Sequence, residues 1–477
     1  MRTEAVPNRP GNAWKASPRP ADGRTFPGRL ALGLLAASLA VPPHAAEAAS
    51  LAIARDAETE ALVQDYAAPL FKAAGIRSNS IQILLVQDPR FNAFVADSQR
   101  MFINTGTIVD SATPNEVIGV LAHETAHLAH GDLAGLRQAI ESTKSAVLVG
   151  ALIGIGTAIA GSLAGGGSEF GAAGAGITAG SMQIGERSLL AYQRTQEAAA
   201  DRSAIDYLNA SGQSGAGMLK TMKRLANDSL LSARDADPYI QSHPLPAERV
   251  VTLENLIKKG KYPSRIDPPE LQRRHDLVRA KLAAFTMTPQ QVGRRYPASD
   301  TSLPARYARA IAAYRTGALA PAIKKIDALI EAEPDNAYFW ELKGQALLEG
   351  GKPRDSVAPL RKAVSLAPRS GLLRIMLGQA LVASGNDADM EEAVKNLTVG
   401  LQSDPDVPNG YRFLARAYAM KKDLAMAELT TAQGLFAEGN VKEAQAHASR
   451  AQAKLKPGTP AWLRADDIVS YKPPKSR

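Results

Sequence analysis

Two hydrophobic patterns divide the chain. From about residue 50 to 266 the pattern is mixed: residues 57–74 have helical spacing, and residues 81–88 (IQILLVQD) form an apolar run typical of a buried strand. The segment 100–106 (RMFINTG) predicts a second strand that ends in a glycine turn. From residue 305 onward the apolar positions follow helical spacing almost throughout. We therefore predict an α+β fold class, mainly α, with a small sheet in the first part only.

The second part repeats with a period of 34 residues. Pro334 and Pro368 are 34 residues apart, as are Gly344 and Gly378. Small residues at such fixed places let paired helices pack closely and stack into a solenoid. The positions that match a tetratricopeptide pattern are Trp340, Gly344, Leu347, Ser356, Leu360, Ala363 and Pro368, then Leu377, Gly378, Ala393, Leu397 and Pro405, with weaker units at Ala310, Ala322, Ile326 and Pro334 and at Tyr411, Leu414, Ala415, Tyr418 and Ala427.

The resemblance to tetratricopeptide repeats predicts an all-α solenoid with a concave surface. Such a surface usually holds a peptide or a partner protein. A solenoid that only braces the first domain is the alternative.

The first 48 residues have the pattern of a secretory signal peptide. Arg24 and Arg29 precede an apolar run over residues 30–41, and Ala46-Glu47-Ala48 offers a cleavage site. The run is too short to span a bilayer, which takes about 20 residues. We expect the mature chain to begin near Ala49; an uncleaved interfacial anchor is the alternative.

The segment 146–166 carries no charge over 21 residues, a length that would admit a transmembrane helix. It is rich in Gly and Ala rather than Leu, and it runs into a second Gly-rich stretch. We expect a mobile hairpin or lid over a functional site of this first part, with peripheral membrane contact. A true membrane span is the alternative, which would make the chain an integral membrane protein.

Composition shifts give the expected domain boundaries. A charged, proline-containing segment follows the mixed part and predicts a linker with one helix. The expected division is a signal peptide at 1–48, a first domain of mixed helices and strands at 49–266, a linker helix at 267–304, the repeat domain at 305–460 and a C-terminal tail at 461–477.

Composition also limits the chemistry. A net charge of +9 on 477 residues gives no argument for nucleic acid as a partner. The chain has no Cys, so disulfides, thiolate metal sites and a cysteine nucleophile are excluded. Any metal site must be built from His, Asp and Glu.

The segment His123-Glu124-Thr125-Ala126-His127 matches H-E-x-x-H. On a helix, residues four apart share a face, so His123 and His127 can hold one metal ion while Glu124 projects beside them. Apolar positions upstream are consistent with a buried, preorganised helix. Imidazole ligands suit zinc and also other divalent metals. We predict one Zn²⁺ per chain.

A catalytic zinc site usually has three protein ligands and leaves a fourth position for water. Glu197 is the best candidate for the third ligand, and Asp201 lies one helical turn further on. Asp201 could accept a hydrogen bond from the free ring N–H of a ligand histidine and fix its tautomer. An E-x-x-x-D pair is weak evidence for a metal ligand by itself, but it becomes strong evidence when an H-E-x-x-H motif lies upstream.

These residues carry a family resemblance. The H-E-x-x-H motif, Glu197-x-x-x-Asp201 and then Ser242-His243-Pro244-x-x-x-x-Arg249 resemble the gluzincin metallopeptidases, which include HtpX and the CAAX prenyl peptidases. Residues 91–94 (FNAF), the signal peptide and the repeats narrow the likeness to the secreted BepA-like (YfgC-like) branch.

The resemblance implies a periplasmic zinc endopeptidase. Members of this branch degrade misassembled outer-membrane proteins, can assist their assembly as chaperones, and contact the β-barrel assembly machinery through the repeats. The resemblance implies that His123, His127 and Glu197 are zinc ligands and that Glu124 is the base. It also implies that His243 can occupy the open zinc position and hold the enzyme latent.

Several roles stay open. Arg249 could stabilise an oxyanion or anchor its loop, and His243 could be a plain loop histidine. The strand at 100–105 could accept an extended substrate at an exposed edge, or its residues could be core. The other histidines that we considered, His130, His275 and His447, are expected to be structural or exposed. The rival to a peptidase is a chaperone or assembly adaptor that acts through the repeats, with a latent metal site.

Overall fold

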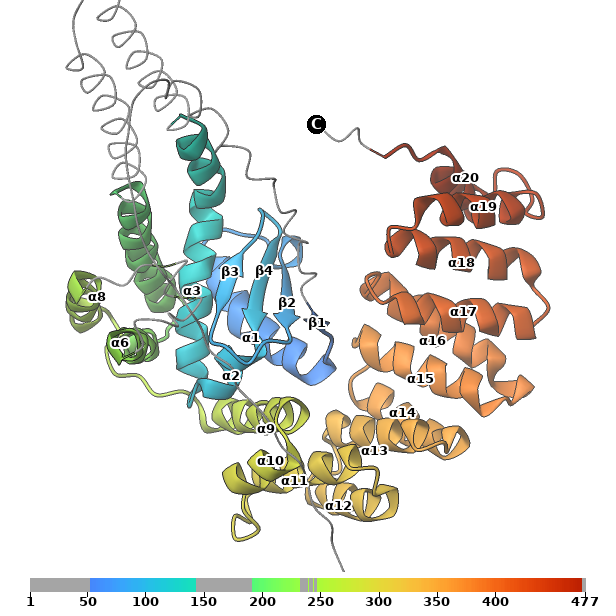
Figure 1. Ribbon diagram of the computed structural model, residues 1–477, viewed down its shortest axis with the longest axis horizontal. Helices are drawn as coiled ribbons and strands as arrows, with labels where there is room; N and C mark the ends of the chain where they lie inside the picture. The colour runs from blue at the N-terminus through green and yellow to red at the C-terminus, as the bar shows by residue number, and fades with distance from the viewer. Residues whose placement is uncertain (1–51, 143–190, 232–238, 240–242, 244–246, 474–477) are drawn as a thin grey trace, which may run out of the picture. The chain divides into compact units, whose positions relative to one another are not determined.

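The computed structural model describes residues 52–142, 191–231, 239, 243 and 247–473 (Figure 1). The expected signal peptide and the segment 146–166 lie outside the described residues, as do Ser242 and Pro244. Within the described part of the chain, no helix has both the length and the hydropathy needed to cross a bilayer. The fold is mainly helical, with one small sheet in the first part, as the hydrophobic pattern predicts.

The sheet has four strands in the order β1-β2-β4-β3. They are β1 (Ile53–Ala54), β2 (Gln82–Val86), β3 (Ala93–Val95) and β4 (Arg100–Asn104). The β2 and β4 strands are parallel, and the two outer pairs are antiparallel. Of the two interpretations of residues 100–105, the exposed edge is wrong and the core is correct: β4 is paired on both sides and its residues after Arg100 are buried, while β3 forms the edge.

Helices α1 (Ala57–Ala73) and α3 (Pro114–His130) pack against the sheet and against each other. The side chain of Asp56 caps α1 by accepting a hydrogen bond from the amide of Thr59. Pro114 begins α3, and Gly131, with φ of 68°, ends it in the left-handed conformation. A second helix follows over residues 132–142. These signals fix where the helix with the H-E-x-x-H motif begins and ends.

The expected glycine turn after the second strand is wrong, because Gly106 lies within α2 (Thr105–Asp110). A Cβ atom at Gly106 would lie 2.1 Å from the carbonyl oxygen of Pro89. The glycine is needed there for a close backbone approach rather than for a turn.

Among the described residues, the first part has three further helices: residues 191–210, α6 (Ala216–Leu231) and α8 (Ala247–Lys259). Helix α6 packs on α3 and α8 packs on α6. The side chains that α1, the sheet and these helices bury form one continuous hydrophobic core. Helix α3, which carries the H-E-x-x-H motif, crosses this core and packs against its other members.

The segment expected to be a linker with one helix contains two, α9 (Pro269–Thr286) and α10 (Pro289–Arg295). Helix α9 has two apolar faces. Val278, Leu282 and Ala283 belong to the core of the first part, whereas Leu277 and Ala280 belong to the core of the first repeats. Its arginines suggested a solvated linker, but its apolar positions bury it on both sides.

The repeats form paired helices that follow one another along the array (Figure 1). The helices are α11 (Leu303–Arg315), α12 (Leu319–Ala332), α13 (Ala337–Glu349), α14 (Pro353–Leu366), α15 (Gly371–Ser384), α16 (Met390–Ser403), α17 (Pro408–Met420), α18 (Leu424–Ala437), α19 (Val441–Gln452) and α20 (Pro460–Ser470). The helix α20 falls within the expected C-terminal tail and packs against α19.

The period of 34 residues has a physical basis in one repeated contact. A Cβ atom at Gly344 would lie 2.4 Å from Cγ of Leu360, and one at Gly378 would lie 2.3 Å from Cγ of Leu397. Each glycine thus admits the leucine of its partner helix. The three extra residues of the third unit form the short helix η2 (Asp387–Asp389) outside this contact.

A buried set of charged groups joins the first part to the repeats. Lys281 Nζ lies 2.5 Å from Asp56 Oδ2, 3.4 Å from Glu58 Oε2 and 3.3 Å from Glu341 Oε2. Tyr307 donates a hydrogen bond of 3.0 Å to Glu58. Burial raises the pKa of Glu341 to about 7, although Lys281 opposes the shift. We call these five residues the junction cluster.

Candidate metal centre

Helix α3 places the two motif histidines side by side. His123 is fully buried and His127 is mostly buried, and their Nε2 atoms lie 3.1 Å apart. Because the residues are four apart on one helix, both rings point to the same face. The sequence predicted that the two imidazoles point to the same place, and the structure shows this arrangement.

The helix over residues 191–210 brings Glu197 to the same point. Its Oε2 atom lies 3.2 Å from His123 Nε2, and its Oε1 atom lies 3.3 Å from His127 Nε2. Tetrahedral ligands at about 2.0–2.1 Å from a metal are separated by about 3.3–3.4 Å. The spacing of these three donor groups therefore fits a single tetrahedral metal ion.

His243 supplies a fourth donor. Its Nδ1 atom lies 3.4 Å from His123 Nε2 and 2.9 Å from Glu197 Oε1. The ligand atoms of His123, His127, Glu197 and His243 all lie within 4.8 Å of one another. We call these four residues the metal-site cluster. His243 thus stands where a catalytic site would keep its open position.

Glu124 lies beside this cluster and is not part of it. The residue is 1% exposed, and its Oε1 atom has no hydrogen-bond partner among the described residues. The nearest basic group is His243 Nε2 at 3.5 Å. A buried carboxylate oxygen without a partner is costly, and a water molecule at the metal would satisfy it.

Asp201 and Arg249 lie next to the metal-site cluster and contact its members. Asp201 Oδ1 lies 3.1 Å from His123 Nδ1, one helical turn beyond Glu197. The guanidinium of Arg249, at the start of α8, donates two hydrogen bonds of 2.8 and 2.9 Å to Asp201 and lies 2.8 Å from Glu197. Arg249 therefore ties the segment after His243 to the helix that carries Glu197.

Asp132 is a site residue that the sequence analysis missed. Its Oδ2 atom lies 2.7 Å from His127 Nδ1, so each motif histidine has an aspartate at the ring nitrogen that faces away from the other ligands. Gly131 turns the chain at the end of α3 and brings Asp132 back to His127. A Gly-Asp pair directly after the motif helix is the sequence signal that could have indicated it.

The electrostatics of the cluster favour an ionised carboxylate. Burial alone would raise the pKa of Glu197, but hydrogen bonds from His123, His127 and His243 hold the pKa well below its usual range. Burial alone would lower the pKa of His127, yet Asp132 and Glu197 raise it to about 10. A cation at this point would satisfy the same carboxylates.

A cleft of about 180 Å³ lies next to the cluster, with Glu124, His127 and His243 on one side. Its other walls are largely apolar: Phe94 and Val95 come from the edge strand β3, and Leu133 and Leu136 from the helix after α3. The cleft offers space for a side chain of an extended polypeptide that runs beside β3.

A helix with H-E-x-x-H, a glutamate that a second helix brings next to it and a neighbouring edge strand are the features of a metallopeptidase. Residues 54–257 match the model of Peptidase family M48. The chain is therefore a metallopeptidase with an M48-like domain over these residues, followed by the helical repeats.

Curated relatives cover both parts of the chain. It is 25% identical over 393 residues to the beta-barrel assembly-enhancing protease of Escherichia coli, a match that covers 80% of this chain and 76% of that protein. The protein of the same name from Yersinia pestis is 24% identical over the same shares. Among solved structures, MamA from Desulfovibrio magneticus RS-1 matches 35% of this chain and 96% of its own, at 16% identity and a TM-score of 0.30.

Proposed function

We propose that this metallopeptidase is a zinc endopeptidase that cleaves misfolded or misassembled outer-membrane proteins and can assist their assembly. The observation that carries the catalytic part is the convergence of His123, His127 and Glu197 on one point, with the unpartnered Glu124 beside it. Three neutral or anionic N and O donors in this geometry suit zinc. The site fits one Zn²⁺.

His123, His127 and Glu197 would hold the cation. Zinc supplies Lewis-acid chemistry there, because it lowers the pKa of water and polarises the scissile carbonyl. Glu124 takes the proton of the attacking water at Oε1 and delivers it to the leaving amine. Asp201 and Asp132 hold the ligand rings in one orientation. Arg249 acts as an anchor, since its guanidinium is committed to Asp201 and Glu197.

The substrate lies extended along β3. Within the described residues, β3 is the strand at the sheet edge nearest to α3, and Phe94 and Val95 line the cleft next to Glu124. An unfolded strand of an outer-membrane protein can pair with such an edge through its main chain. The strand over residues 100–104, for which the sequence left both an exposed edge and a place in the core open, lies inside the sheet and does not have this role.

His243 keeps the site latent. Its ring occupies the fourth donor position and lies within 3.5 Å of Glu124, so water and substrate need it to move. In the His243→Ala variant we expect faster cleavage. Unchanged or slower cleavage would contradict the latch and would assign His243 to catalysis or structure.

The biological setting follows from the relatives and the leader. The name of the curated relatives supports a role in β-barrel assembly, and the expected signal peptide supports secretion to the periplasm. The repeats would contact the β-barrel assembly machinery. For the limits between the signal peptide, the peptidase and the repeats, we keep the boundaries expected from the sequence. Cell fractionation, with salt and carbonate washes, tests the location.

The second candidate is a chaperone or assembly adaptor with a latent metal site. The donor that His243 adds to the cluster favours it, because a site with four protein donors has no open position. The two roles can coexist if His243 moves.

One experiment separates these functions. The chain from residue 49 to 477 is purified, its zinc content is measured, and its cleavage of casein and of an unfolded β-barrel protein is compared with that of Glu124→Gln and His243→Ala. Bound zinc with cleavage abolished by Glu124→Gln supports the peptidase. Zinc without cleavage in any variant supports the adaptor.

A further inference from the structure

The sheet has a second open edge, on the side away from β3. Strand β1 covers β2 only through two residue pairs, Ile53 with Val86 and Ala54 with Leu85. After Ala54 the chain leaves the sheet. The main-chain groups of Asp56 are both used in the first turn of α1, where its amide donates to Glu60 Oε1 and its carbonyl accepts from the Glu60 amide.

Ile83 is therefore left with an unpaired side. The amide of Gln82 donates to the Gln99 carbonyl, so Gln82 and Leu84 direct their main-chain groups to β4. Because the direction alternates along a strand, the amide and carbonyl of Ile83 face the other way. No strand pairs with Ile83 on that side within the described part of the chain.

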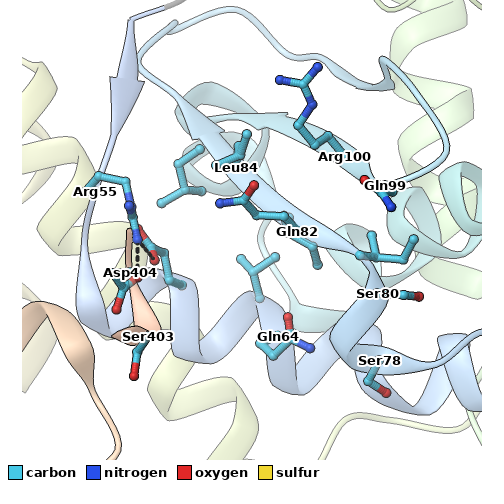
Figure 2. A pocket seen from close by; sticks show the side chains of 15 residues that line it. Arg55, Gln64, Ser78, Ser80, Gln82, Leu84, Gln99, Arg100, Ser403 and Asp404 are labelled. Atoms are coloured by element: carbon cyan, nitrogen blue, oxygen red, sulfur yellow. Dashed lines mark hydrogen bonds and ion pairs between the residues drawn. The ribbon is translucent and has the colours of Figure 1, made fainter. Parts of the chain in front are cut away.

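A polar groove of about 720 Å³ lies along this edge (Figure 2). Helix α1 provides one side and β2 another, and Ser403 and Asp404 at the C-terminal end of α16 close one end. The volume falls in the range of roughly 300–1,000 Å³ that ligand sites have. The uncharged polar side chains that line the groove are Gln64, Ser78, Ser80, Gln82, Gln99 and Ser403.

The charges of the groove are largely satisfied internally. Arg55 is hydrogen-bonded to Glu60 and to Asp404, so its charge is balanced by these two carboxylates and needs no charged ligand. Its Nη1 atom, however, is buried without a hydrogen-bond partner among the described residues. A donor of this kind beside an open strand edge fits a carbonyl oxygen.

We propose that the open edge of β2 is a second polypeptide-binding site, where an extended segment of an unfolded protein adds as an antiparallel strand opposite Ile83. The segment continues the ladder that β1 starts, and amide and hydroxyl side chains of the groove bind its main chain. The strand order places this site at the opposite sheet edge from the metal centre. The proposal rests on the proposed function only in taking the segment from a substrate protein.

The test measures binding without cleavage. The full chain with Glu124→Gln is titrated against fluorescein-labelled β-casein, an unfolded polypeptide, and Kd is followed by fluorescence anisotropy. Ile83→Pro removes the outward amide without touching the bonds to β4, and Gln64→Trp fills the groove from α1. We expect either change to raise Kd about fivefold. Lys72→Trp, on the same helix outside the groove, is the matched control and leaves Kd unchanged.

Two outcomes overturn the proposal. One is an unchanged Kd in Gln64→Trp, provided that its melting temperature equals that of the parent; this variant decides the question if Ile83→Pro does not fold. The other is a dimer, measured by light scattering, that Ile83→Pro converts to a monomer, since a second copy of the chain would then be the occupant. A chain that cleaves casein neither as wild type nor as His243→Ala would refute the peptidase proposal and leave this binding result unaffected.

Discussion

The molecule buries two sets of charged groups, and they differ in how they are completed. The junction cluster contains its own cation: Lys281 lies within 3.4 Å of three carboxylates, and none of the cluster's side-chain atoms lacks a partner in the described residues. In the metal-site cluster the donor atoms converge, while Glu124 beside it keeps an unpartnered oxygen. Buried charge alone therefore does not indicate function; convergence of incompletely satisfied donors does.

The largest expected effect tests the unpartnered oxygen. Glu124→Gln keeps the shape of the side chain and removes the base, so we expect kcat/KM on casein to fall by at least about 10²–10⁴-fold. Zinc content and melting temperature stay unchanged, because Glu124 is not in the metal-site cluster. Loss of zinc in this variant would show that Glu124 is a ligand.

The second prediction breaks the junction cluster. Lys281→Met leaves buried carboxylates without their cation, so we expect the free energy of unfolding to fall by about 3–5 kcal/mol. Urea denaturation measures it. The control is Lys223→Met, which removes an exposed pair with Glu254 and should cost at most about 1 kcal/mol. Equal effects in the two variants would contradict the role of Lys281.

The third prediction concerns Asp132 and the geometry of the metal-site cluster. Asp132→Ala frees the ring of His127, so we expect zinc affinity to fall about 10–100-fold, and Asp132→Asn, which keeps an acceptor, to lose less. Competition with a chromogenic chelator measures it without relying on activity. Asp97→Ala, at an exposed ion pair with Arg100, is the control. Full affinity in Asp132→Ala would leave Asp132 as a helix-end residue only.

The smallest expected effect is a pH dependence of the junction cluster. Since the pKa of Glu341 is raised to about 7 in the folded chain, the folded state binds a proton more tightly than the unfolded state. The stability from this proton is fully present below the unfolded pKa and is lost as pH rises through about 7. We expect a loss of about 1 kcal/mol between pH 6 and 8.

Glu341→Gln should remove this slope, as measured by urea denaturation at the two pH values. The result is taken as the difference between wild type and variant, because burial lowers the pKa of His275 to about 4 and gives a slope of opposite sign. Identical slopes in the two proteins would show that Glu341 stays ionised.

The sequence predicts that His123, His127 and Glu197 lie close together because the signals for this arrangement are local. A helical spacing of four residues determines how His123 and His127 face, and the second helix repeats the argument for Glu197 and Asp201. The contact of Asp132 with His127 was not predicted, because it depends on the turn at Gly131, which lies beyond the end of the helix. The position of β3 at the edge of the sheet was not predicted, because β3 has only three residues and its pairing with β4 is not encoded in the local sequence.

The linker prediction failed for a related reason. The segment before and within α9 is charged and contains prolines, a composition that favours a linker. Its apolar positions serve two partners on two faces, so neither face shows the simple amphipathic period of a surface helix. Which partner each face meets is a property of the tertiary structure.

The two-faced packing of α9 also makes the peptidase and the repeats difficult to separate. Removal of the repeats would uncover Leu277 and Ala280, and removal of α9 would uncover the side of the peptidase that Val278 and Leu282 cover. The two parts should therefore melt in one cooperative transition. For the evolution of such proteins, this means that a repeat array cannot simply be exchanged: any replacement must bring a helix that completes both cores.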